Sequence, residues 1–244
     1  METILLIDFE NFRKNAENVF FAAHVPKPIW YTYDFRGLFQ KVLNGTHVDA
    51  TIFYYARVTE HAATAKKSKE LIQNRRLLKQ HLERQGFRVI TAGHVRGQQV
   101  TNSFLGLHNK LVFKEKGVDV RIAIDMILCV VDKLVQTIIL GSSDSDLQPA
   151  ITEVKRRGGT CIYLGFESNS NKGIAYNCGR AILIRDSEIL ILHRSRQVLT
   201  PIVSAPWRNY GAGIPPCVLS TSKDYGWAKP SFVSSYATGY GRTQ

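Results

Sequence analysis

Short apolar runs that alternate with helix-like segments constrain the fold of this chain more than any other feature. The first run, at residues 3–8, is apolar up to a closing carboxylate, and the run at 136–140 is followed at once by Gly, Ser and Asp. Uninterrupted runs of this kind are typical of strands that are buried on both faces of a parallel sheet. Four further strands are predicted, at residues 49–55, 87–90, 160–164 and 181–184.

Helical segments are predicted between these strands. The longest has Leu71, Leu78 and Leu82 on one stripe and ends at Gly86. Strands that alternate with helices imply right-handed crossovers and a sheet that helices cover on both faces. We therefore predict an α/β fold with a parallel sheet flanked by helices, in which residues 91–117 form a loop. The predicted helices span residues 34–43, 60–85, 118–132, 146–157 and 171–178.

The composition changes at about His193, so that one domain is predicted over residues 1–192. The remaining residues, 193–244, hold five Pro, five Gly and seven Ser, with neither a helix period nor a strand period. They carry six basic residues against one acid, together with seven aromatic residues. This composition predicts a flexible, basic tail that contains aromatic residues.

The chain is strongly basic, with 32 Lys and Arg against 20 Asp and Glu, a formal net charge of +12. Residues 57–96 alone carry ten Lys and Arg against three Glu. A basic surface favours a polyanion, either nucleic acid or an anionic membrane, although many basic helices are simply solvated. No apolar run approaches the roughly 20 residues needed to span a membrane, so no membrane-spanning segment is expected.

The cysteines and the first residues of the chain favour a reducing compartment. Cys129 and Cys161 lie in apolar runs, and none of the four cysteines forms a C-x-x-C pair. The first eleven residues, METILLIDFEN, have no basic leader and no cleavable apolar stretch. We therefore expect a cytoplasmic protein without a disulfide framework.

Carboxylates stand where the predicted strands end. Asp8 closes the first strand, Asp144 and Asp146 follow the fourth, and Asp119 begins an apolar helix. In an open α/β sheet, ligands bind outside the carboxyl ends of the strands, where the strand order reverses. Carboxylates gathered there would repel one another unless they hold a hard divalent cation, which can then act on a phosphodiester. Each acid taken alone could equally be a helix cap.

Three motifs resemble those of NYN domains, a family of PIN-like nucleases. The run LLIDFEN is similar to the opening strand of the family, in which an Asp is followed shortly by an Asn. KGVDVRIAIDM is similar to the second acidic motif, and ILGSSDSDLQPAITEVKRRGGTCIYLGF to the third. The resemblance covers about residues 3–190 in the family's order. It implies a PIN-like, Rossmann-like fold and cleavage of RNA with the help of Mg²⁺ or Mn²⁺.

Carried onto this sequence, the resemblance also implies which residues form the site. The catalytic, metal-binding acids would be Asp8, Asp119, Asp144 and Asp146. Supporting roles would fall to Asn11, which would orient the site by hydrogen bonds, and to Asp125 and Glu10. Independently of the resemblance, the positive charge of the long helix and of the segment before the second acidic motif suits a polyanion, so their basic residues are expected to bind RNA. These residues are Lys66, Lys67, Lys69, Arg75, Arg76, Lys110, Lys114 and Lys116.

We therefore expect a metal-dependent endoribonuclease that acts mainly on single-stranded RNA, because an open rim admits a single strand more easily than a duplex. One alternative is an inactive RNA-binding scaffold with the same fold. An Asp-dependent phosphohydrolase fits less well, since Asp8-Phe9-Glu10 stands where that class often has Asp-x-Asp. A topoisomerase-primase-type metal fold would match Asp144 and Asp146 but not the earlier motifs. Formation of a homodimer and a protein partner for the tail are left open.

Overall fold

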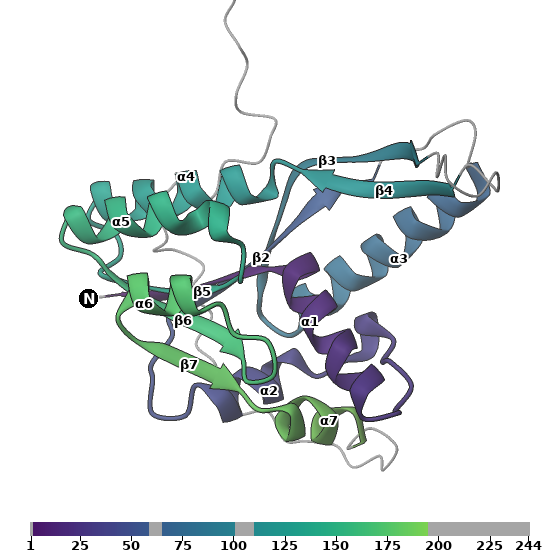
Figure 1. Ribbon diagram of the computed structural model, residues 1–244, viewed down its shortest axis with the longest axis horizontal. Coiled ribbons are helices and arrows are strands. Elements are labelled where there is room, and N and C mark those ends of the chain that lie inside the picture. The colour runs from purple at the N-terminus through teal and green to yellow at the C-terminus, as the bar shows by residue number, and fades with distance from the viewer. Residues whose placement is uncertain (1, 59–64, 101–109, 195–244) are drawn as a thin grey trace, which may run out of the picture.

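A seven-stranded sheet forms the middle layer of the molecule (Figure 1), in the order β4-β3-β2-β1-β5-β6-β7. The computed structural model describes residues 2–58, 65–100 and 110–194. Within the sheet β4 is antiparallel to β3, and the other six strands are parallel to one another. The strands are β1 (Thr3–Asp8), β2 (Ala50–Arg57), β3 (Arg88–Val100), β4 (Lys110–Lys116), β5 (Thr137–Gly141), β6 (Thr160–Phe166) and β7 (Ala181–Ile184).

Helices cover both faces of the sheet, as the alternating pattern predicted. One face is covered by α1 (Phe9–Ala22), α2 (Phe35–Val42), α3 (Ala65–Arg84) and α7 (Asp186–Arg194). The other face is covered by α4 (Val118–Val131), α5 (Gln148–Arg156) and α6 (Lys172–Cys178). Two short 3-10 turns, η1 (Trp30–Thr32) and η3 (Ser145–Leu147), lie in the connections. Among the described residues, no helix combines the length and apolar character that crossing a membrane requires.

The central strand β1 contributes to the cores on both faces. Leu5 and Ile7 pack with the helices of the first face, and Ile4 and Leu6 with those of the second. All four side chains are buried. This is why the sequence of β1 is apolar without interruption, since successive side chains of a strand point to opposite faces.

The strand order reverses at β1, and this places the candidate site. β1 pairs with β2 on one side and with β5 on the other, with Ile7 opposite Gly141 in the β5 register. After β1 the chain crosses to β2 on one side of the sheet, whereas after β5 it crosses to β6 on the other side. Such a switch point is where open α/β sheets bind their ligands.

The segment at 91–117 differs from the predicted loop. β3 continues to Val100, and β4 pairs with it over the range from His94 opposite Lys116 to Val100 opposite Lys110. Gly93 makes the approach of these strands possible, because its φ is +70° and a Cβ there would lie 2.0 Å from the Lys116 carbonyl oxygen. The pairing was missed because residues 91–100 show neither an uninterrupted apolar run nor a regular alternation of apolar and polar residues.

Candidate active site

Asp8 stands at the centre of the candidate site, as the last residue of β1 and the N-cap of α1. Its Oδ1 accepts a hydrogen bond from the Asn11 backbone N–H (3.1 Å), and its Oδ2 accepts one from the Ser142 hydroxyl (3.4 Å). The side chain is buried, with only 8% of its surface exposed. Burial raises the pKa of Asp8 from 3.8 to about 6, and the negative charges of Glu10 and Asp144 add to this rise.

Asp144 approaches Asp8 from the loop that follows β5. The Ser142 hydroxyl links the two acids, since it donates to Asp8 and accepts from the Asp144 backbone N–H (3.3 Å). Asp144 Oδ1 in turn accepts from the backbone N–H of Asp146 (3.1 Å), so Asp144 caps the turn η3. The Asp146 residue is exposed to solvent. The structure therefore brings Asp8 and Asp144 together, with Asp146 on the outer side of the same turn.

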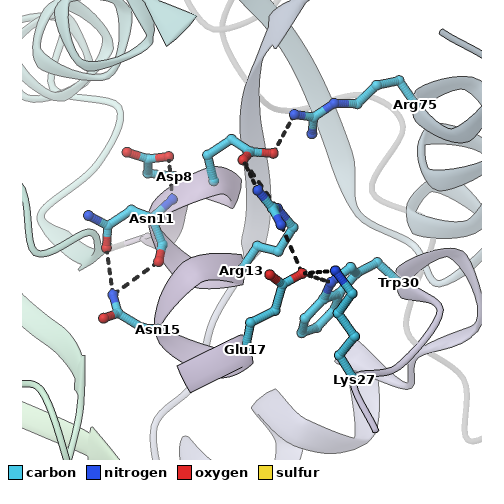
Figure 2. A network of polar contacts seen from close by, with 9 residues as sticks. Asp8, Asn11, Arg13, Asn15, Glu17, Lys27, Trp30 and Arg75 are labelled. Atoms are coloured by element: carbon cyan, nitrogen blue, oxygen red, sulfur yellow. Dashed lines mark hydrogen bonds and ion pairs between the residues drawn. The ribbon is translucent and has the colours of Figure 1, made fainter. Parts of the chain in front are cut away.

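Asn11 fixes the position of the loop that carries Asp144. Its side-chain oxygen accepts hydrogen bonds from the Ser143 backbone N–H (3.1 Å), the Ser143 hydroxyl (2.9 Å) and the Asn15 amide (3.1 Å). Figure 2 shows Asn11 beside Asp8 at the start of α1, with Asn15 one turn further along. From the other side, the Asn171 amide donates to the Ser143 carbonyl (2.9 Å). The loop is thus held between α1 and the start of α6.

Sequence reasoning overlooked part of this polar frame. Asn15 was a detectable candidate, because it follows Asn11 by four residues and so lies on the same face of a helix. Ser142 and Ser143 stood inside the acidic motif but were not assigned roles. Asn171 could not be linked to the site from sequence, because the contact depends on how α6 packs.

Glu10 is held by two arginines. It accepts hydrogen bonds from Arg13 (2.6 Å) and from Arg75 of α3. The Arg75 guanidinium also lies over the rings of Phe9 (5.4 Å) and Tyr55 (4.9 Å). Burial alone would raise the pKa of Glu10, but the hydrogen bonds and charges of Arg13 and Arg75 outweigh it and lower the pKa. Glu10 therefore joins α1 to α3 as a carboxylate.

The two acids of the second motif occupy different environments on α4. Asp119 lies in the first turn of α4 and is half-buried. Asp125 is 1% exposed and accepts hydrogen bonds from Tyr54 of β2 (3.0 Å) and from Arg121 (2.9 Å). Asp125 thus fastens α4 to the sheet. α4 also contacts η3, the turn that begins beside Asp144.

Asp8 and Asp144 suit a hard divalent cation. Mg²⁺ commonly binds through one or two carboxylates, with waters and substrate phosphates as its other ligands. The raised pKa of Asp8 shows that its charge is disfavoured by burial and by neighbouring acids, and a bound cation would offset both effects. In the part of the chain that the structure describes, no group of three or more His, Cys, Asp or Glu side chains could hold a metal. The set of four acids therefore stays a prediction.

The predicted RNA-binding residues lie on α3 and β4. Figure 1 shows α3 and the β3–β4 pair extending together to one side of the molecule. Lys69, Arg76 and Lys116 are exposed there, whereas Arg75 is largely buried in its contact with Glu10. The other four side chains lie outside the described part of the molecule: Lys66, Lys67, Lys110 and Lys114.

Comparison with known proteins gave a family and distant structural likenesses. The model of the NYN domain matches residues 2–184. A solved structure of a protein of unknown function from Vibrio parahaemolyticus RIMD 2210633 has 17% sequence identity and a TM-score of 0.47. That match covers 75% of this chain and 92% of the other. No curated protein matches the chain.

Proposed function

Because this chain belongs to the NYN domain family, a family of PIN-like nucleases, we propose that it is a metal-dependent endoribonuclease acting on single-stranded RNA. The observation that carries the proposal is the buried carboxyl of Asp8, held beside Asp144 at the switch point of the sheet. A buried acid with a perturbed pKa at such a position is characteristic of a functional site.

In this proposal, Asp8 and Asp144 hold Mg²⁺ or Mn²⁺, and Asp119 and Asp146 complete the acidic set. When bound, the ion supplies a positive charge that stabilises the transition state and favours an attacking hydroxide. The chain's own contribution is to fix the geometry. Asn11 keeps the loop after β5 in place, and Ser142 sets the spacing of the two central acids by its paired hydrogen bonds.

The proposed substrate class rests on the basic residues of α3 and β4. α3 and β4 present exposed basic residues such as Lys69, Arg76 and Lys116, which suit a phosphate backbone. Two carboxylates would repel a polyanion unless cations neutralise their charge. The metal ion and these basic residues would do so together. A single strand can bend into the rim more readily than a duplex, so single-stranded RNA is the proposed substrate.

The proposal is tested by cleavage of a labelled single-stranded RNA in EDTA, Mg²⁺ and Mn²⁺. We expect that Asp8→Asn and Asp144→Asn each lower the cleavage rate at least about 100-fold, because each removes a charge that the metal needs. Asp132→Asn, at an exposed position after α4, is the matched control and should cut like the wild type. If Asp144→Asn cuts at the wild-type rate in both metals, Asp144 is not a ligand.

An RNA-binding scaffold without activity is the second candidate function. It would use the same fold and the same exposed basic residues, such as Lys69 and Arg76, to bind RNA without cutting it. Binding of RNA by the wild type without cleavage in either metal would establish this alternative. An Asp-dependent phosphohydrolase is disfavoured because Glu10, the second acid of Asp8-Phe9-Glu10, is occupied by Arg13 and Arg75.

A further inference from the structure

A pocket of about 460 Å³ opens next to the candidate site, between α1, the segment at 27–31 and α3. Phe9 and Glu10, the two residues that follow Asp8, form part of its wall. Most of the remaining wall is apolar or aromatic and includes Trp30. The volume lies within the range of roughly 300–1,000 Å³ that is typical of small-molecule sites.

One wall of the pocket is a row of five charges of alternating sign, which Figure 2 shows in part. From α3 towards solvent the order is Arg75, Glu10, Arg13, Glu17 and Lys27. Arg13 lies 2.6 Å from Glu10 and 2.8 Å from Glu17, whereas Lys27 lies 3.7 Å from Glu17 and its side chain is 67% exposed. The wall thus has one more positive than negative charge, and its most exposed cation has the longest ion-pair distance.

We infer that this pocket receives one base of the RNA strand, turned out beside the phosphate that is cut, while Lys27 binds a neighbouring phosphate. The inference rests on the proposed ribonuclease function and names a subsite for it. A base turned out of a single strand packs readily against aromatic and apolar side chains of the pocket wall, such as Trp30 and Ile29. Lys27 can exchange Glu17 for a phosphate at little cost, because exposed ion pairs contribute little free energy.

The position of the pocket argues for a nucleotide of the bound strand. Phe9 directly follows Asp8 in the chain, so a strand whose phosphate lies at Asp8 has its neighbouring nucleotides at the pocket. α3 forms another wall through Leu71 and Asn74 and carries the exposed basic residue Arg76. An RNA backbone that follows α3 would therefore pass the pocket on its way to the acids.

The test uses the full chain and a fluorescent oligoadenylate of about twelve nucleotides, in which a single abasic position is moved along the strand. Binding is measured in EDTA, so that no strand is cut, and cleavage is measured in parallel in Mg²⁺. Asn74→Trp fills the pocket from its α3 wall, and Gln73→Trp, exposed on α3 and outside the pocket wall, is the matched control. We expect one abasic position to weaken wild-type binding about tenfold.

Asn74→Trp should bind the intact strand about tenfold more weakly than Gln73→Trp and should no longer respond to that abasic position. Equal affinities of the two variants, or an abasic effect that is the same at every position, would overturn the inference. Wild-type cleavage in Mg²⁺ would then leave the ribonuclease proposal intact. A position-specific effect without any cleavage would instead support base binding in the pocket and contradict the proposed nuclease activity. If adenosine monophosphate binds in the pocket while the strand shows no abasic effect, the inference also fails.

The phosphate contact of Lys27 is tested by the salt dependence of the same binding. Lys27→Ala should reduce the slope of log affinity against log salt by about 0.7, the value for one phosphate contact on a single strand. Lys14→Ala, at an exposed position of α1 outside the pocket wall, is the control and should keep the wild-type slope. Equal slopes for the two variants would overturn the contact.

Discussion

Asp8 contributes to the free energy of folding in two opposite ways. As the N-cap of α1 it accepts a hydrogen bond from the Asn11 backbone N–H, which stabilises the start of the helix. Its burial beside Glu10 and Asp144 raises its pKa from 3.8 to about 6, so the charged form is disfavoured in the folded protein. Because this folded pKa lies above the unfolded one, protonation of Asp8 stabilises the folded state, and this contribution is complete below about pH 4. It is lost as the pH rises through about 6.

We therefore predict that Asp8→Asn stabilises the metal-free protein at pH 8, by up to about 3 kcal/mol, the free energy that corresponds to the two pKa values. Asn retains the size and capping ability of Asp, so the start of α1 should be unaffected. Near pH 4 the gain should disappear. Unfolding by urea at both pH values, with Asp132→Asn as the control, measures this difference. A variant that is less stable than the wild type at pH 8 would contradict the prediction.

Single residues of the site could be predicted from sequence to different extents. The proximity of Asp8 and Asp144 follows from two apolar strands that each end before an acid, because adjacent parallel strands end at the same edge. The two arginine partners of Glu10 had no such signal. Arg75 comes from a distant helix, and its contact exists only because α3 packs against α1. A sequence pattern can therefore place strand ends, but not side chains that meet across elements.

At the scale of elements, α3 combines two kinds of basic residue that look alike in the sequence. Arg75 is directed into the molecule, where it contacts Glu10 and lies over Phe9 and Tyr55. Arg76, the next residue, is exposed. Neighbouring positions of a helix point about 100° apart, so adjacent arginines can serve the core and the surface separately. Both were predicted to bind RNA.

We predict that Arg75→Ala lowers the free energy of unfolding by about 1–3 kcal/mol, because it leaves Glu10 with one fewer partner and removes the ring contacts. Arg76→Ala is the matched control and should change stability by less than about 0.5 kcal/mol, while weakening RNA binding with a smaller salt slope. Thermal unfolding and a binding series in salt separate the two effects. Similar stabilities for both variants would show that the contact of Arg75 with Glu10 contributes nothing measurable.

The helices and strands differ in how well their own sequences predict them. α1 was not predicted, although Phe9, Phe12, Ala16 and Val19 are buried at helical spacing and Asp8 is a good N-cap residue. That signal was present and could have been used. The β3–β4 pair is a different case. Its strands are consecutive in the chain, but residues 91–100 lack the apolar pattern of a strand, and the requirement for Gly93 becomes visible only once Lys116 is beside it.

For the molecule as a whole, the layered α/β architecture was the most predictable property. Strands that are buried on both faces have to be apolar throughout, and the sequences of β1, β5 and β6 are accordingly apolar over most of their length. The order of the strands follows less directly. The sequence predicted a parallel sheet covered by helices, which the structure confirms, but the antiparallel edge strand β4 was not predicted.

Residues 195–244 lie outside the described residues, and truncation can test what they contribute. α7 ends at Arg194, so the comparison is between residues 1–194 and the full chain. The composition of residues 195–244, rich in Pro, Gly and Ser, argues against a packed core, and we expect truncation to leave the melting temperature unchanged. The aromatic and basic residues of this segment should stack on bases and contact phosphates, so we expect truncation to weaken RNA binding.

The outcomes of this truncation separate three roles. A lower affinity together with a smaller salt slope would establish the contact with phosphates. Equal affinity and equal slope would refute it and leave a linker or a segment that binds another protein. A large fall in melting temperature would show that these residues pack on the domain and that the domain boundary lies further along the chain. Because the charge of the segment is positive, the difference in affinity between the two chains should be largest at low salt.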